Sequence, residues 1–215
     1  MTRILRCDRE DFCLYTLVPL GIFLLGVTVN TAAVLLGAES TFAFLPIFLL
    51  LACALLGLSG GISALLYAFP LAVSFSIPRR RALGGVVVYL LAIWAVLAVL
   101  STALVLVDHW YVYNILPMLV PGLEVMGDPL YELGVSYIIV AATLGVATGF
   151  LGGTAILRFG RKGGWALWGI YMAALLCREQ IAWAALLNDW PYWVLVLLML
   201  LGLSVWSLLH WDVRR

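Results

Sequence analysis

The sequence predicts an all-α polytopic membrane protein with six transmembrane helices and both termini on the cytoplasmic side. Three observations lead to this fold class. The 215 residues are 65% hydrophobic and 11% charged, whereas soluble domains carry roughly 25% charged residues. Apolar runs long enough to span a bilayer recur along the chain, and the basic residues gather between alternate runs. A water-soluble globule is therefore excluded, and we expect a single transmembrane domain over residues 1–215.

The first element is a mixed-charge segment, residues 1–13, which precedes the first apolar run. Its charges are interspersed with Ile4, Leu5 and Phe12, so we expect an amphipathic lead-in along the cytoplasmic surface of the membrane. A signal peptide is not expected, because acidic residues precede an apolar run that is too long and that no cleavage site follows.

Six apolar runs follow. They lie at approximately 14–36, 42–67, 86–107, 135–157, 165–177 and 192–209. The fifth run would rise only about 20 Å as a helix, which is short of a hydrocarbon core of about 30 Å. We therefore expect residues 178–191 to form a short outer helix or turn after it. Residues 108–134 contain three prolines, which interrupt helices, and are expected to form an outer loop. Whether these two segments dip into the membrane stays open.

The Lys and Arg residues decide the orientation, because cytoplasmic connections carry an excess of them. Of the 12 such residues, only Arg178 falls on the side opposite the termini. The others are Arg3, Arg6, Arg9, Arg79, Arg80, Arg81, Arg158, Arg161, Lys162, Arg214 and Arg215. Both termini, the connection 69–85 and the connection 158–164 are therefore expected in the cytoplasm.

No ionisable residue lies near the middle of a predicted span. Ion-coupled transporters and proton pumps use such groups, so a transporter of this sequence would draw its energy from outside the bilayer. The chain has no HExxH, no Walker lysine motif and no GxGxxG, and its four cysteines form no CxxC pair. We expect no metal site, no nucleotide site and no nucleic-acid partner for this chain.

Small residues recur at every fourth position of two predicted spans, where they let helix backbones approach closely. The second span carries Gly57 and Gly61, and the fourth carries Ala141, Gly145, Gly149 and Gly153. The sequence leaves open whether these faces pack inside the chain or against a second membrane chain.

The segment GLSGG at 57–61 resembles the Gly-x-Ser-Gly motif of rhomboid-type intramembrane proteases. Such a nucleophile needs a histidine base on a neighbouring helix, and His210 at the inner end of the last span would have to activate Ser59. The rest of the rhomboid pattern is missing. A serine in a glycine-rich packing face explains the motif more simply.

The segment LAVSFSIPRRRALGG at 71–85 is similar to the pattern Leu-Ala-x-Ser-Phe-Gly-x-x-Arg-Arg-x-(Phe)-x-x-Gly of small ATP-binding-cassette type-2 permeases of Gram-positive bacteria, which are membrane subunits of type V exporters. The residues that match are Leu71, Ala72, Ser74, Phe75, Arg79 and Arg80. Ser76 and Leu83 depart from the pattern, which has glycine and often phenylalanine there. RFGRKGGWALW at 158–168 resembles the second cytoplasmic loop of these permeases, and the predicted six-span topology agrees with theirs.

The resemblance implies a multi-pass permease subunit of a bacterial plasma membrane, paired with a second identical or homologous permease chain. Two cytoplasmic ATPase subunits would carry ATP and Mg²⁺, so this chain is not expected to be an enzyme. A coupling helix between spans two and three would dock on the ATPase, as would the lead-in helix. The candidate coupling residues are Phe69, Phe75, Ser76, Ile77, Pro78, Arg79, Arg80 and Arg81, and the second cytoplasmic loop contributes Arg158, Arg161 and Lys162.

A path without intramembrane charge suits an apolar or amphipathic cargo, such as a peptide, a lipid or a drug. Two simpler interpretations stay open. In the first, the arginines only fix the topology and contact lipid phosphates. In the second, the chain is a non-transporting scaffold or a lipid- or peptide-sensing subunit.

Overall fold

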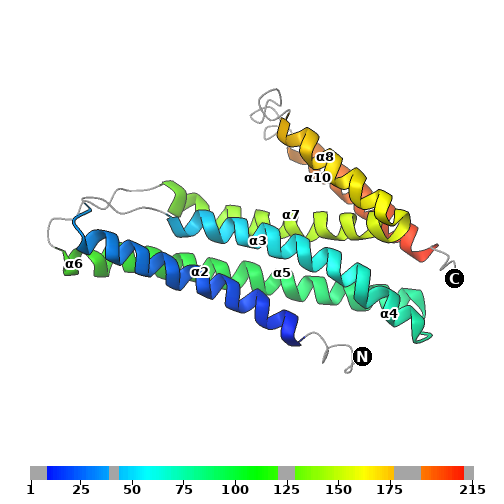
Figure 1. Cartoon of the computed structure of the whole chain (residues 1–215), viewed down its shortest axis with the longest axis horizontal. Helices are drawn as coiled ribbons and strands as arrows, with labels where there is room; N and C mark the ends of the chain where they lie inside the picture. The colour runs from blue at the N-terminus through cyan, green and yellow to red at the C-terminus, as the bar shows by residue number, and fades with distance from the viewer. Residues whose placement is uncertain (1–8, 39–43, 121–128, 177–189, 211–215) are drawn as a thin grey trace. The chain divides into compact units, whose positions relative to one another are not determined.

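The computed structural model describes residues 9–38, 44–120, 129–176 and 190–210. Within these ranges nearly every residue is helical and no strand occurs (Figure 1). The helices are α2 (Arg9–Leu35), α3 (Phe44–Ser63), α4 (Phe69–Ser74), α5 (Arg79–Trp110), α6 (Leu116–Leu119), α7 (Pro129–Phe159), α8 (Arg161–Leu176) and α10 (Trp190–Leu209). Two π-helical segments, η1 (Ala64–Ala68) and η2 (Tyr111–Ile115), continue α3 and α5. The all-α fold class is confirmed for the described residues.

The chain forms two compact units. Unit 1 comprises Met1–Gly57 and Leu91–Val146, and unit 2 comprises Leu58–Leu90 and Ala147–Arg215. The helices α3, α5 and α7 each contribute residues to both units.

Four helical stretches of the described chain are long and apolar enough to cross a membrane. They are Cys13–Leu35, Leu45–Ser74, Arg79–Leu119 and Val135–Phe159, and Leu197–Leu209 is a shorter apolar helix. Many of their large apolar side chains are exposed, as the lipid-facing surface of a membrane helix requires. The stretches agree with the first four predicted spans, and the count of six stays a prediction.

The predicted outer connection beginning at Asp108 was wrong at its start, because the helix continues through η2 and α6 to Leu119. Pro117 lies at the start of α6, directly after the π-helical segment η2, and the helix continues past it for only two more residues, to Leu119. The chain becomes extended only at Val120. The end of that connection was also wrong, because residues 129–134 belong to α7. Residues 121–128 of the connection and 178–189 of the predicted outer helix lie outside the described residues, as do residues 1–8 of the lead-in.

The two basic connections are also shorter than predicted. The segment 69–85 is helical except at 75–78, so Arg79 begins α5 and does not lie in a loop. The segment 158–164 is helical except at Gly160, so α8 begins at Arg161. In both places a backbone cap that the residue pattern does not reveal reverses the chain within a few residues.

Candidate functional site

The small-residue faces of α3 and α7 pack against each other and fix the positions of these helices. A Cβ atom added to Gly61 in unit 2 would lie 2.5 Å from the Gly149 carbonyl carbon, and one added to Gly57 in unit 1 would lie 2.9 Å from the Val146 nitrogen. Two helices approach this closely only where both backbones lack side chains. The two small-residue faces therefore pack against each other within the chain, and Ala141 is buried there as well. These faces comprise Gly57, Gly61, Ala141, Gly145, Gly149 and Gly153.

The turn between α4 and α5 is a Schellman cap. The Ser76 N–H donates to the Val73 carbonyl at 3.0 Å, and the Ile77 N–H donates to the Ala72 carbonyl at 3.2 Å. Ser76 has φ of 61°, the left-handed conformation that this cap requires and that glycine usually supplies. Pro78 follows, and its carbonyl accepts the first hydrogen bonds of α5. The serine thus stands where the permease pattern has glycine.

The corner between α7 and α8 is a single residue. Gly160 has φ of 59°, and its N–H donates to the Ile156 carbonyl at 2.7 Å, which closes α7. Its own carbonyl accepts from the Gly163 N–H at 3.0 Å and opens α8. Gly163 packs so closely on Ala155 that a Cβ atom would collide with the Ala155 carbonyl oxygen. The first turns of α8 therefore fold back along α7.

Within unit 2, two arginines tie the basic segments to the end of α10. The Arg79 guanidinium donates to the Leu209 carbonyl at 3.4 Å, and a cation at a helix carboxyl end is stabilised by the helix dipole. The Arg158 guanidinium donates to the Ser207 hydroxyl. The start of α5, the α7–α8 corner and the end of α10 thus lie together. We call this region the basic end of unit 2.

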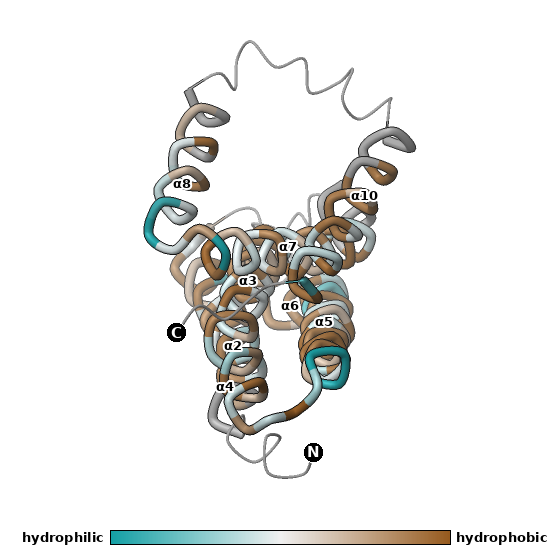
Figure 2. The backbone as a smooth tube through the Cα atoms, turned by 90° about the vertical axis from the view of Figure 1, so that its right-hand side faces the viewer, coloured by the Kyte–Doolittle hydropathy of each residue, from teal (hydrophilic) through white to brown (hydrophobic). Residues whose placement is uncertain are grey.

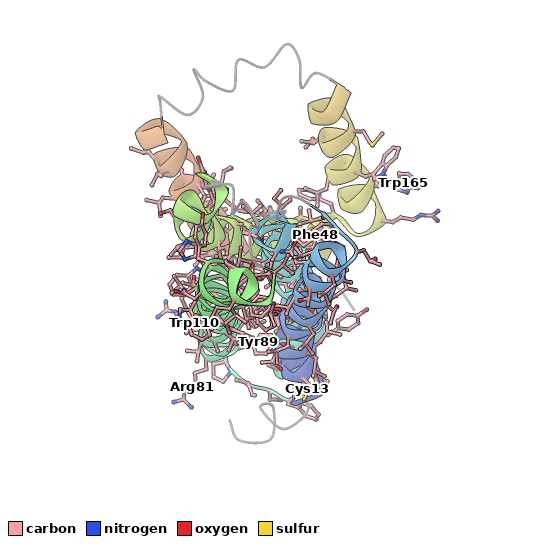
Figure 3. The ribbon with its side chains drawn as sticks, turned by 90° about the vertical axis from the view of Figure 1, so that its left-hand side faces the viewer. Cys13, Phe48, Arg81, Tyr89, Trp110 and Trp165 are labelled. Atoms are coloured by element: carbon pink, nitrogen blue, oxygen red, sulfur yellow. The ribbon has the colours of Figure 1, made fainter. Side chains whose placement is uncertain are left out.

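The remaining cations of the basic end lie on the surface of unit 2. Arg80, Arg81, Arg161 and Lys162 are exposed, and no acidic residue occurs in 58–90, 147–176 or 190–210, the described ranges of unit 2. In Figure 2 the start of α5 and the α7–α8 corner are teal, whereas the helices that lead to them are largely brown. Arg81 and Trp165 project outward in Figure 3. The basic end is a positive surface without an internal counterion in these ranges.

The apolar residues predicted to accompany the arginines differ in exposure. Phe75 is 71% exposed, whereas Phe69 is 1% exposed. Phe69 therefore belongs to the core of unit 2 and cannot serve as a docking anchor, because its side chain is not accessible to a partner. Ile77 is half-buried and Pro78 is exposed.

No family model, curated protein or solved structure matches the chain. The assignment of a function therefore depends on the residues of the site.

Ser59 and His210 form no catalytic pair. His210 follows α10 at the basic end, where its Nδ1 contacts the Trp206 carbonyl at 2.9 Å and its ring lies 4.8 Å from the Trp206 ring. Ser59 lies fifteen residues before the end of α4, which is roughly 20 Å along the helix axis from the α4–α5 turn. A nucleophile and its base must be within hydrogen-bond reach, so the protease hypothesis is not supported.

A polar cluster in unit 1 was not expected from the sequence. The Thr31 and Tyr111 hydroxyls share a hydrogen bond of 2.7 Å, and Asn30 and Asp108, next to them along α2 and α5, are buried. Asp108 and Tyr111 are three residues apart, on one helix face. Asn30, a polar residue in an apolar predicted span, was the only indication of this cluster in the sequence analysis. The cluster was missed because Asp108 was predicted to lie in a loop.

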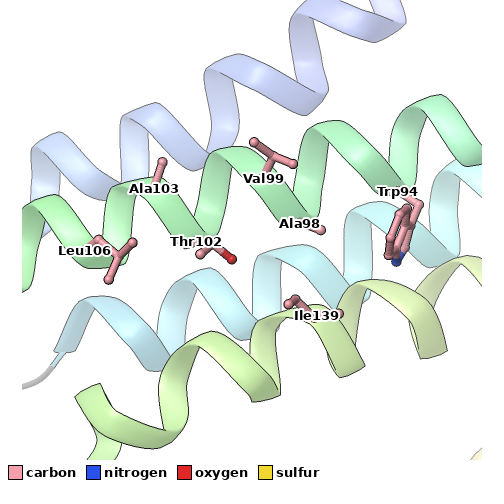
Figure 4. Close-up of a pocket in the computed structure, with 7 residues that line it drawn as sticks. All are labelled: Trp94, Ala98, Val99, Thr102, Ala103, Leu106 and Ile139. Atoms are coloured by element: carbon pink, nitrogen blue, oxygen red, sulfur yellow. The ribbon is translucent and has the colours of Figure 1, made fainter.

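Two of the surface grooves on the described residues lie beside tryptophan side chains. One, of about 580 Å³, lies at the α7–α8 corner and is lined by Ile156, Gly160, Arg161, Gly164, Trp165 and Trp168. The other, of about 350 Å³, runs along α5 and α7 in unit 1 (Figure 4). The unit 1 groove is lined by Trp94, Ala98, Val99, Thr102, Ala103, Leu106 and Ile139. The acyl chains of surrounding lipid suffice to cover its uncharged surface.

Proposed function

We propose that the chain is the membrane-spanning permease subunit of an ATP-driven exporter of the ATP-binding-cassette type. Separate cytoplasmic ATPase subunits would bind ATP and Mg²⁺ and would dock on the basic end of unit 2. The cargo class that fits is apolar or amphipathic: a peptide, a lipid or a hydrophobic drug. Both termini would lie in the cytoplasm of a bacterial cell, and the permease would pair with a second identical or homologous chain.

The observation that carries this proposal is the convergence of the basic segments. The start of α5 and the α7–α8 corner, which are far apart in sequence, both contact the end of α10 through Arg79 and Arg158. Their other cations are exposed and have no acidic residue in the described ranges of unit 2. Such a surface favours an anionic partner, because charge complementarity steers association and selects the partner.

The burial of Asp108 does not require an internal proton relay. It lies 29 residues after Arg79 in one helix, which is about 44 Å along the axis and beyond a hydrocarbon core of about 30 Å that begins at Arg79. The midplane of the predicted span therefore stays without charge. This supports a permease that receives its energy from an external ATPase.

Docking is tested by reversing the two exposed charges at the start of α5. The chain is co-expressed with an ATPase that carries Walker motifs and is encoded by a neighbouring gene, and the ratio of ATPase to permease is measured after affinity purification. We expect Arg80→Glu with Arg81→Glu to lower this ratio roughly tenfold or more, because attraction to acidic groups becomes repulsion. Arg79 is left unchanged because it caps α10.

The matched control is Arg80→Lys with Arg81→Lys, which keeps both charges and should retain the ATPase. Retention of the ATPase at the wild-type ratio by the glutamate variant would show that the docking assignment is wrong. Absence of any such ATPase gene near this one would favour the non-transporting scaffold or sensing subunit.

A further inference from the structure

The groove at the α7–α8 corner changes from polar to apolar along one direction. Arg161 stands at the first residue of α8, beside the end of the apolar stretch Val135–Phe159. Trp165 and Trp168 follow one and two turns further along α8, and Ile156 lies one turn back along α7. Gly163 holds the start of α8 against α7. If α7 crosses the membrane, these apolar side chains therefore lie deeper in it than Arg161.

The two indole rings present an exposed apolar surface beside this cation. Trp165 and Trp168 are 59% and 56% exposed, and their ring centroids are 5.7 Å apart in an edge-to-face arrangement at 85°. Tryptophan at this depth is typical of the interface between headgroups and acyl chains. The groove of about 580 Å³ has room for a headgroup and the upper part of a chain.

The charge of Arg161 determines which chemical group the polar end of the groove can bind. Arg161 is exposed, and the described ranges of unit 2 hold no acidic side chain to neutralise it. Arginine binds phosphate oxygens through a planar fork of N–H donors. A molecule with an anionic head and an apolar tail therefore matches the order of Arg161, Trp165 and Trp168.

We propose that the α7–α8 groove is a binding site for one anionic phospholipid, whose phosphate contacts Arg161 and whose acyl chain lies against Trp165 and Trp168. The site belongs to the permease alone and does not depend on the ATPase-docking role of Arg80 and Arg81. A bound lipid would cover the exposed indole rings and would neutralise the charge at the corner, which holds the start of α8 at the membrane boundary.

The test uses two lipid probes that differ only in the headgroup. The full chain, without any ATPase, is reconstituted in phosphatidylcholine vesicles that contain either phosphatidylglycerol or phosphatidylcholine with the same photoactivatable acyl chain. Labelled peptides are then quantified by mass spectrometry. We expect the phosphatidylglycerol probe to label α8 several-fold more than the phosphatidylcholine probe, and to label the uncharged unit 1 groove no more than the phosphatidylcholine probe does.

Three variants assign that preference to the groove. Arg161→Gln should lower the labelling ratio at α8 to about one, Arg161→Lys should retain part of it, and Lys162→Gln, whose side chain does not line the groove, should leave it unchanged. All are substitutions of exposed residues, so an unchanged elution profile is the check of folding. Equal labelling of wild-type α8 by the two probes, or an undiminished ratio in Arg161→Gln, would overturn the proposal.

Two other occupants would also overturn it. Loss of α8 labelling when soluble glycerol phosphate is added would identify a site for a free phosphate. Efficient disulfide formation between two copies of Trp168→Cys, with little lipid labelling, would identify an interface between copies of the chain.

Discussion

Ser76 holds a backbone conformation that serine rarely adopts. Its φ of 61° places Cβ close to its own carbonyl oxygen, which costs about 1–2 kcal/mol for a residue with a side chain. The Schellman cap of α4 needs this conformation to satisfy the Ala72 and Val73 carbonyls. The strain is therefore the cost of a sharp turn immediately before the arginines.

We expect Ser76→Gly to raise the free energy of unfolding by about 0.5–1 kcal/mol, because glycine removes the strain but loses more backbone entropy on folding. Unfolding by denaturing detergent, followed by circular dichroism, measures the change. Ser74→Gly is the matched control, since Ser74 ends α4 in helical conformation and should lose stability. A loss of stability in Ser76→Gly would contradict the role assigned to this turn.

Asp108 shows how burial alters the interpretation of a residue. In the sequence it follows an apolar run and precedes prolines, a pattern typical of a loop. In the structure it is 0% exposed on a continuous helix, close to the hydrogen-bonded pair of Thr31 and Tyr111. The expectation of a loop failed because the helix continues through η2 and past Pro117, and ends only at Leu119.

At the scale of the element, the short distance between the backbones of α3 and α7 requires glycine at their contact. A Cβ atom on Gly61 would lie within 2.5–2.7 Å of the Gly149 and Phe150 backbone, and backbone atoms cannot move aside as a flexible side chain does. The α3–α7 contact is therefore intolerant of even one methyl group.

We expect Gly61→Ala to lower the free energy of unfolding by about 1–3 kcal/mol, measured by the same detergent titration. Gly85→Ala is the control: it makes the same change in helix α5, where an added Cβ has nothing within 4 Å, and should be neutral or stabilising by up to about 1 kcal/mol. Equal effects of the two substitutions would contradict the close α3–α7 contact.

At the scale of the molecule, the stretch Arg79–Leu119 sets the two sides of the membrane. Its 41 residues extend about 60 Å, roughly twice the hydrocarbon thickness. If the helix crosses the bilayer, its ends must therefore lie on opposite sides. The arginines at one end predict that this end faces the cytoplasm, and the same side is predicted for Lys162 of the basic end.

We expect a membrane-impermeant maleimide to label Met118→Cys in intact cells and to leave Lys162→Cys unlabelled, in a background whose four native cysteines are replaced. Both positions are exposed, so permeabilised cells should label both equally. Labelling of Lys162→Cys from outside would reverse the orientation, and labelling of both in intact cells would show that the stretch does not cross the bilayer.

The sequence by itself determined the fold class and the first four apolar spans, because runs of apolar residues have one solution in a bilayer: a helix that satisfies its own hydrogen bonds. It also identified the small-residue faces and the basic segments. The tertiary structure decided which face meets which. It placed Phe69 in the core, joined Arg79 and Arg158 to the end of α10, and reduced two predicted loops to Ser76 and Gly160 caps. These features depend on contacts between residues far apart in the chain and on single backbone angles, which neither composition nor periodicity encodes.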